Sequence, residues 1–132
     1  MTEPRGLIGL GLPGQLAKRL GIAARTTDAN LNGGAAFASA TAIGQFQFYV
    51  RANAQAGANV FQMPNNAEVG SEFQIFNTGS VAANVYPPTI SGGTGVFNVN
   101  AGATATLTAV ATGKGIMLIA VTASTYDAFL TA

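Results

Sequence analysis

The chain has 132 residues and contains no cysteine, no histidine and no tryptophan. Without cysteine there is neither a disulfide framework nor a thiolate nucleophile. Without histidine, the side chain used most often in general acid–base catalysis is missing, and no imidazole can activate a serine or threonine. This inventory disfavours the common hydrolytic and redox enzymes. We therefore expect a protein that is not an enzyme and that uses no cofactor.

Charge is also scarce, since only 8% of the residues are charged, against about 25% in ordinary globular domains. Glycine alone accounts for 17 residues, and alanine, threonine and asparagine are abundant as well. Such a surface is solvated mainly by amides and hydroxyls. It suits a protein that is packed against other proteins.

The few charges are unevenly distributed along the chain. Residues 1–27 carry a net charge of +3 and residues 28–132 a net charge of −2. We therefore divide the chain into an N-terminal arm, residues 1–27, and a body, residues 28–132. An acidic protein surface is a better partner for the arm than nucleic acid, because its basic residues have no aromatic neighbour among them. These basic residues are Arg5, Lys18, Arg19 and Arg25.

A short helix is predicted within the arm over residues 12–20, LPGQLAKRL. Leu16 and Leu20 share a face four residues apart, Leu12 extends the stripe, and Gly21 stands where a helix stop is expected. Two turns of helix are marginal in water. We therefore expect the leucines and the basic residues of the arm to contact a partner protein.

No stretch of the sequence predicts a membrane segment. No run approaches the ~18 apolar residues that span a bilayer. The N-terminal GLIGLGL is short and rich in glycine, which argues against a signal-peptide core. We expect a soluble protein that is not secreted by that route.

The body shows the period-two alternation of β-strands. Phe46, Phe48 and Val50, for example, alternate with polar or amphipathic residues. The spacing of the segments is typical of an antiparallel sandwich or barrel. We predict an all-β fold, an antiparallel, jelly-roll-like β-sandwich of about eight strands, entered through a linker at residues 26–36. The strands are expected at 45–52, 59–63, 72–77, 82–87, 95–100, 103–110, 115–122 and 125–130.

Two segments of the body stand out. The stretch NVYPPTISGG, residues 84–93, contains two prolines that cannot donate to a ladder and glycines that permit unusual backbone angles, so it predicts a corner between strands. The segment GIMLIAV, residues 115–121, is apolar on both faces. Either it is a central strand, or its outer face contacts another subunit. Met117, Ile119 and Val121 are the candidate interface residues.

Other candidate sites are better explained structurally. GLGLPG, residues 9–14, fits G-x-G-x-x-G, but no strand precedes it. Glu68 and Glu72 are the only close carboxylates, and both occupy positions typical of solvated charges, so neither acid catalysis nor a metal site is favoured. Lys114 lies in a glycine turn, TGKG. The tyrosines Tyr49, Tyr86 and Tyr126 suit half-buried strand positions better than a sugar-binding platform.

The stretch NVYPP, a glycine turn and then VFNVNAGATATLTAVATG resembles a pattern in small virion proteins of tailed bacteriophages. The resemblance covers about residues 68–122. Over this stretch the chain is similar to capsid cement or decoration proteins, which have a jelly-roll-like body and an N-terminal arm. Many members end in a strand that contains tryptophan, whereas this chain ends in TYDAFLTA.

The resemblance implies a structural virion protein on the capsid exterior, made in the host cytoplasm. It implies a homotrimer seated where major capsid protein subunits meet, with no nucleic acid, membrane or small-molecule substrate. The alternative is a head-fibre or tail module that binds a host receptor or glycan.

Overall fold

The computed structural model describes residues 27–45, 47–90, 93–99, 102–104 and 108–131. These residues form thirteen strands and one short 3-10 turn, η2 (Phe37–Ser39). The predicted all-β class is therefore confirmed. The helix expected at residues 12–20 lies outside the described residues. Within the described ranges, no helix is long and apolar enough to cross a membrane.

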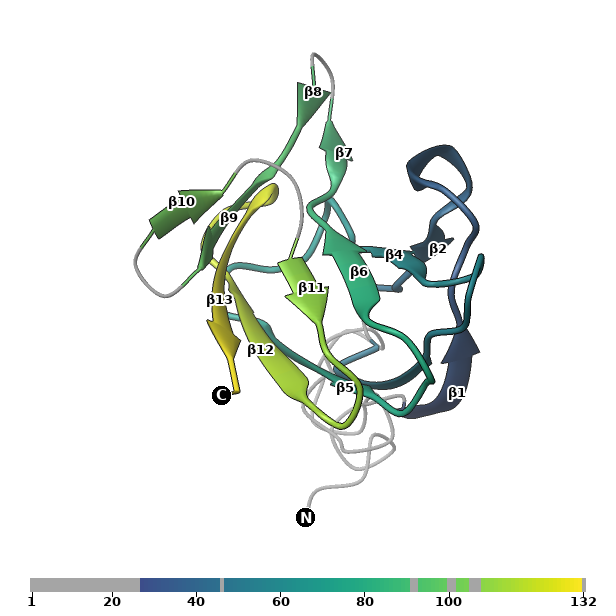
Figure 1. Cartoon of the computed structure of the whole chain (residues 1–132). Coiled ribbons are helices and arrows are strands. Elements are labelled where there is room, and N and C mark those ends of the chain that lie inside the picture. The colour runs from purple at the N-terminus through teal and green to yellow at the C-terminus, as the bar shows by residue number, and fades with distance from the viewer. Residues whose placement is uncertain (1–26, 46, 91–92, 100–101, 105–107, 132) are drawn as a thin grey trace, which may run out of the picture.

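The strands form two large sheets and one small hairpin (Figure 1). The seven-stranded sheet has the order β1 (Thr27–Asn32), β3 (Tyr49–Asn53), β5 (Glu72–Asn77), β12 (Gly115–Ala120), β13 (Thr125–Leu130), β9 (Val96–Val99) and β10 (Gly102–Thr104). The four-stranded sheet has the order β11 (Thr108–Val110), β6 (Ala83–Tyr86), β4 (Val60–Gln62) and β2 (Thr41–Ala42). The hairpin joins β7 (Thr89–Ile90) to β8 (Gly93–Thr94).

The first half of the body, β1 to β6, winds as a coil. Odd-numbered strands lie in the seven-stranded sheet and even-numbered strands in the four-stranded sheet, and each pairs in parallel with the strand one turn earlier. Tyr49 lies beside both Thr27 and Gln74, so successive turns are 22 and 25 residues apart. We call residues 27–86 the coil region. It is a short two-sheeted solenoid.

The second half, β9 to β13, closes the end of this coil, and we call residues 96–130 the closing region. β12 pairs antiparallel with β5, and β11 pairs antiparallel with β6. β12 and β13 form an antiparallel hairpin, and β10 pairs antiparallel with β9. Only β13 and β9 pair in parallel. The closing region thus adds a strand of reversed direction to each sheet of the coil.

The expectation of an antiparallel sandwich is therefore wrong for the coil region. A parallel pair needs a crossover of a dozen or more residues, and here a strand of the opposite sheet forms part of each crossover. All eight predicted segments contain strand, but 103–110 divides into β10 and β11. The sequence pattern missed β1, β2, β7 and β8. Thr27–Asn32, expected to be linker, is the edge strand β1.

One hydrophobic core lies between the two sheets. In β5, Phe73 and Ile75 point into it while the side chains between them are exposed. Tyr126 of β13 contacts the rings of Phe73 and Phe97 edge-on, at centroid distances of 6.0 and 6.2 Å. The Tyr126 hydroxyl donates a hydrogen bond to the Pro64 carbonyl. Burial raises the pKa of Tyr126 above its ordinary value, because an ionised phenol loses solvation in the core.

A buried amide joins the two halves of the body. Asn77 ends β5 and is fully buried. Its Nδ2 donates to the carbonyls of Val81 and Val110, both at 2.8 Å, and its Oδ1 accepts from the Gly79 amide at 2.9 Å. Both N–H donors and the carbonyl oxygen of the side chain have a partner, so burial leaves none of its polar atoms unpaired.

A second set of amides follows the surface of the coil region. Asn53 Nδ2 donates to Asn32 Oδ1, Gln55 Nε2 donates to Asn53 Oδ1, and Ser80 Oγ donates to Gln55 Oε1, each at 2.8 Å. We call Asn32, Asn53, Gln55 and Ser80 the amide ladder. It connects β1 and β3 to the turn that follows β5.

The expected corner is present. β6 ends at Tyr86, the two prolines that follow are buried, and the Gly95 amide donates to the Pro88 carbonyl at 2.7 Å. The chain then leaves the four-stranded sheet for β9 in the seven-stranded sheet. A Cβ atom at Gly95 would lie 2.0 Å from the Ser124 carbonyl oxygen, so glycine is required there.

Candidate functional site

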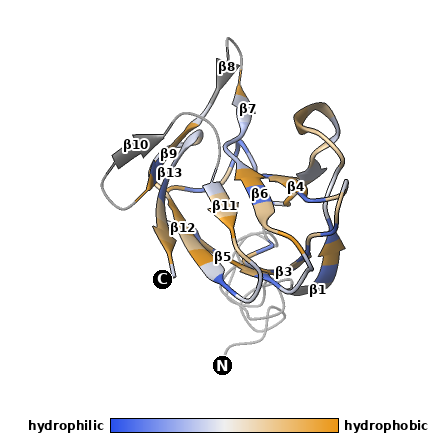
Figure 2. Cartoon of the chain, in the orientation of Figure 1, coloured by the Kyte–Doolittle hydropathy of each residue, from blue (hydrophilic) through white to orange (hydrophobic). Residues whose placement is uncertain are grey.

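The strongest candidate for a functional surface is the outer face of the seven-stranded sheet. β12 is the fourth strand of seven, so the interpretation of GIMLIAV as a central strand is correct. Ile116, Leu118 and Ala120 point inward and are buried, whereas Met117 and Ile119 point outward and are half-buried. The strand is coloured as hydrophobic in Figure 2.

Neighbouring strands extend this apolar surface. Met117 lies between Gln74 of β5 and Phe129 of β13 in the register of the sheet. Phe129 is 46% exposed, and Tyr49 and Phe76 are each 37% exposed. Large aromatic side chains at this level of exposure are typical of interaction surfaces. We call the set Tyr49, Phe76, Met117, Ile119 and Phe129 the outer apolar face.

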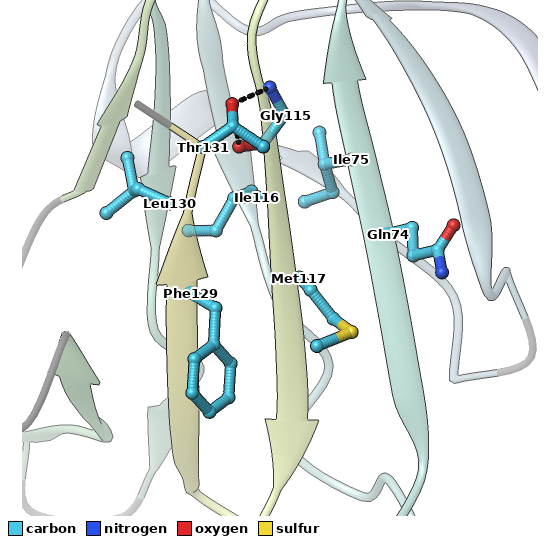
Figure 3. A pocket seen from close by; sticks show the side chains of 8 residues that line it. All are labelled: Gln74, Ile75, Gly115, Ile116, Met117, Phe129, Leu130 and Thr131. Carbon is cyan, nitrogen blue, oxygen red and sulfur yellow. Dashed lines mark hydrogen bonds between the residues drawn. The ribbon is translucent and has the colours of Figure 1, made fainter.

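A hollow of about 320 Å³ opens on this face (Figure 3). It lies where Gly115 contributes no side chain, between β5 on one side and the end of β13 on the other. The Gly115 amide donates to Thr131 Oγ1 at 3.0 Å, and Thr131 Oγ1 donates to the Gly115 carbonyl at 3.1 Å. The lining residues are Gln74, Ile75, Gly115, Ile116, Met117, Phe129, Leu130 and Thr131.

Charged side chains border the outer apolar face in a definite order. Arg51 of β3 lies beside Phe76, whereas Glu72 and Asp127 lie on either side of Ile119. The basic group and the acidic groups therefore lie at opposite ends of the face along the strand direction. Asp127 Oδ1 accepts a hydrogen bond from Asn98 Nδ2 at 3.0 Å.

The structure places only some of the sequence candidates on this face. Met117 and Ile119 belong to it. Val121 lies past the end of β12, is 41% exposed and belongs to the turn into β13. Sequence reasoning missed Tyr49, Phe76 and Phe129. Their strands were recognised, but only the strand order of the sheet shows that they surround β12.

The arm candidates lie outside the described residues and are not placed by the structure. They are Arg5, Leu12, Leu16, Lys18, Arg19, Leu20 and Arg25. The glycine motif at residues 9–14 falls in the same segment.

The remaining sequence candidates do not converge on a site. Tyr126 belongs to the core, Tyr86 contacts Phe37 at a centroid distance of 4.8 Å, and Tyr49 lies on the outer apolar face. The three rings therefore form no shared platform. Glu68 and Glu72 are both exposed. Among the residues that the structure describes, no three His, Cys, Asp or Glu side chains gather as metal ligands.

One buried polar atom stands apart. Thr108 in β11 is 5% exposed, and its Oγ1 has no hydrogen-bond partner in the described part of the chain. Its neighbour Ala109 is exposed, so the hydroxyl-bearing residue, rather than the alanine, faces inward.

No family model matches the sequence, and no curated protein and no solved structure matches it either.

Proposed function

We propose that the chain is a structural protein of a tailed-bacteriophage head, a capsid cement or decoration protein without enzymatic activity. The observation that carries this proposal is the outer apolar face, a set of five large apolar side chains on the central strands of an exposed sheet. A protein that works alone in solution usually covers such a surface with charge. A protein that works inside an assembly uses it as contact area.

The residue inventory supports the same proposal. The chain contains no histidine and no cysteine, and in the described part of the chain no three acidic side chains gather at one place. The low charge of the body leaves shape and apolar contact as the main sources of affinity for a partner.

In this proposal the arm and the body have different roles on the outside of the capsid. The arm supplies the bridge to the major capsid protein, with leucines for apolar contact and basic residues for attraction that salt weakens. The resemblance implies three copies around each contact point. The proposal of a jelly-roll-like body rests on the family resemblance and on the antiparallel strand pairs of the closing region.

The decisive experiment locates the chain in native particles. Purified virions of the phage that encodes it are analysed by mass spectrometry and imaged by cryo-electron microscopy. We expect stoichiometric amounts of the chain and density for its two-sheeted body on the outer capsid surface. Absence from the particles overturns the proposal. A position in a fibre, together with binding on a glycan array, supports the receptor-binding alternative instead.

A truncated chain that begins at Thr27 tests the role of the arm. It keeps every residue of β1, so its melting temperature should stay close to that of the full chain while capsid binding falls sharply. Burying the three leucines contributes about 4–8 kcal/mol, and ordering about twenty residues costs at least as much. Replacing the arm's four basic residues by glutamine is the matched control and should reduce only the salt-sensitive part of binding. Unchanged capsid binding of the truncated chain would assign the contact to the body.

A further inference from the structure

We propose that the outer apolar face pairs with the same face of a second copy of this chain, about a twofold axis that runs across the strands. This inference goes beyond the proposed function, because it concerns the free protein and does not require a capsid. It rests on the order of the side chains along the sheet.

The outward side chains of the four central strands form three rows across the sheet. The register of the strands assigns every member. Adjacent rows are about 7 Å apart, twice the rise of a strand residue. The first row is Arg51, Phe76, Gly115 and Thr131; the middle row is Tyr49, Gln74, Met117 and Phe129; the third row is Glu72, Ile119 and Asp127.

A twofold axis along the middle row places the first row of each copy against the third row of the other. Gly115 then faces Ile119 of the second copy, because both lie on β12. The surface is hollow over Gly115, because glycine has no side chain. Ile119 is half-buried and points outward. A recess therefore meets an outward-pointing side chain, and the symmetry makes the contact twice.

The charges match under the same operation. Arg51 of β3 lies opposite the end of the sheet where Glu72 stands on the adjacent strand β5. Within one chain Arg51 and Glu72 are separated along the strand direction by about 13 Å, which is four residues of strand. They therefore do not pair with each other within one chain. Thr131 similarly comes opposite Asp127. Under this operation Glu72 faces Phe76 directly, and Arg51 lies one strand away from Glu72 of the second copy at the same end of the face. The single basic residue among the described members of the face therefore lies beside an acidic one, which favours a second copy over an unrelated partner.

The apolar contact along the middle row comes from β12 and β13, whereas Gln74 and Tyr49 bring polar groups to the same row. Met117 meets Met117, and Phe129, the most exposed ring of the face, meets Phe129. The three rows cover less area than the ~800 Å² per partner of a standard interface. We therefore expect a weak pair, with a Kd on the order of 10–1000 μM. Attachment of many copies to one particle would raise their local concentration and favour the contact.

The first test is the mass of the full-length chain by sedimentation velocity and light scattering between about 10 μM and 1 mM. The expected result is a concentration-dependent shift from monomer to dimer. Ile119→Glu should abolish the shift, whereas Val69→Lys should not, since Val69 is 72% exposed and lies outside the face. A monomer at the highest concentration overturns the proposal, and so does a trimer, which a twofold contact does not build and which would support the threefold arrangement that the resemblance implies.

A charge exchange tests the register itself. Arg51→Glu and Glu72→Arg should each weaken self-association at least about tenfold, because like charges then lie beside each other. Mixing the two variant chains should restore pairing, since each then offers the charge that the other needs. Both side chains are exposed, and unchanged melting temperatures of the single variants verify folding.

If the wild-type chain pairs but the mixture of variants does not recover, the twofold register is wrong. Neither result bears on the location of the chain in virions, so failure of this inference is distinguishable from failure of the proposed function.

Discussion

The coil region and the closing region use the same alternation of apolar and polar residues, yet they pair their strands in opposite ways. In the coil region each strand returns to its own sheet only after a strand in the other sheet, so neighbours are parallel. In the closing region a short turn, residues 121–124, joins β12 directly to β13, so they are antiparallel. Strand direction is therefore decided by the connections and not by the strands.

Two turns, one in each region, differ in how tightly they are packed. Gly79 lies in the turn after β5, where a Cβ atom would be 2.0 Å from the Ala54 carbonyl oxygen. Gly113 lies in the turn before β12, where a Cβ atom would meet nothing within 4 Å. The turn after β5 therefore packs against the backbone of the preceding coil, whereas the turn between β11 and β12 faces solvent at Gly113.

The largest effect should come from Gly79→Ala. The added methyl group overlaps backbone atoms that cannot move without displacing a whole coil, so we expect a loss of at least about 4 kcal/mol or failure to fold. The matched change Gly113→Ala should cost only about 1 kcal/mol, because strain at its φ of +74° is the sole penalty. Chemical denaturation of both variants measures the difference. Equal losses would show that the coils are not in close backbone contact.

The second largest loss of stability is expected for Asn77→Ala, because Asn77 connects the two regions. The change leaves the Val81 and Val110 carbonyls and the Gly79 amide without their partner, two of these hydrogen bonds lying at 2.8 Å. We expect a loss of about 2–4 kcal/mol. Hydrogen exchange should show that β11 loses protection more than β3 does. Uniform loss of protection would instead indicate a single cooperative unit.

Tyr126→Phe should give a smaller effect with a distinctive pH dependence. At neutral pH we expect a loss of about 1 kcal/mol for the hydrogen bond to Pro64. The raised pKa means that the folded state keeps the phenol neutral while the unfolded chain ionises near the ordinary value of about 10. The stability due to Tyr126 is thus fully present below pH 10 and declines above it.

The Tyr126→Phe variant should therefore lose less stability than the wild type between pH 10 and 12, and the two denaturation curves should converge. Tyr49 and Tyr86 are unchanged in both proteins, so their contributions cancel. Parallel stability profiles over that interval would argue against a buried, neutral Tyr126.

The two smallest effects are expected for Asn53→Ala and Asn98→Ala. Asn53→Ala interrupts the amide ladder at two hydrogen bonds. The ladder is exposed, so we expect a loss of about 0.5–1 kcal/mol. Asn98→Ala removes the single bond to Asp127 in the closing region and should cost about half as much. Thermal unfolding resolves the pair. A larger effect for Asn98→Ala would reverse the comparison between the regions.

The sequence predicts those strands that carry their own alternation of apolar and polar residues. Glu72–Asn77 and Thr125–Leu130 are predicted with the bounds that the structure shows. The parallel pairing was not predictable in the same way. The connecting residues 52–60 and 78–82 do not indicate which of the two sheets the next strand joins. Thr27–Asn32 was missed since its sequence, TDANLN, is polar and resembles a turn.

The candidate site was predictable only in part for a related reason. Met117 and Ile119 were found because an antiparallel strand with two apolar faces is unusual. Phe76 and Phe129 lie in strands with ordinary alternation. In such strands the sequence does not distinguish an exposed phenylalanine of an interaction surface from any other residue. Their importance depends on lying beside β12, which for Phe76 joins segments about forty residues apart and for Phe129 follows from the hairpin of β12 and β13. The hollow over Gly115 depends on the same adjacency.

The order of strands in the larger sheet also has a consequence for synthesis on the ribosome. The coil region is synthesised before the closing region. At that stage β5 is paired with β3 along one edge, and its other edge stays unpaired until β12 is made about forty residues later. At 5–20 residues per second, this edge stays open for about 2–8 s. During that interval the nascent chain presents Phe73 and Ile75 on an unpaired strand, which is a template for association with other chains. The larger sheet can therefore be completed only after the C-terminal third of the body has been made.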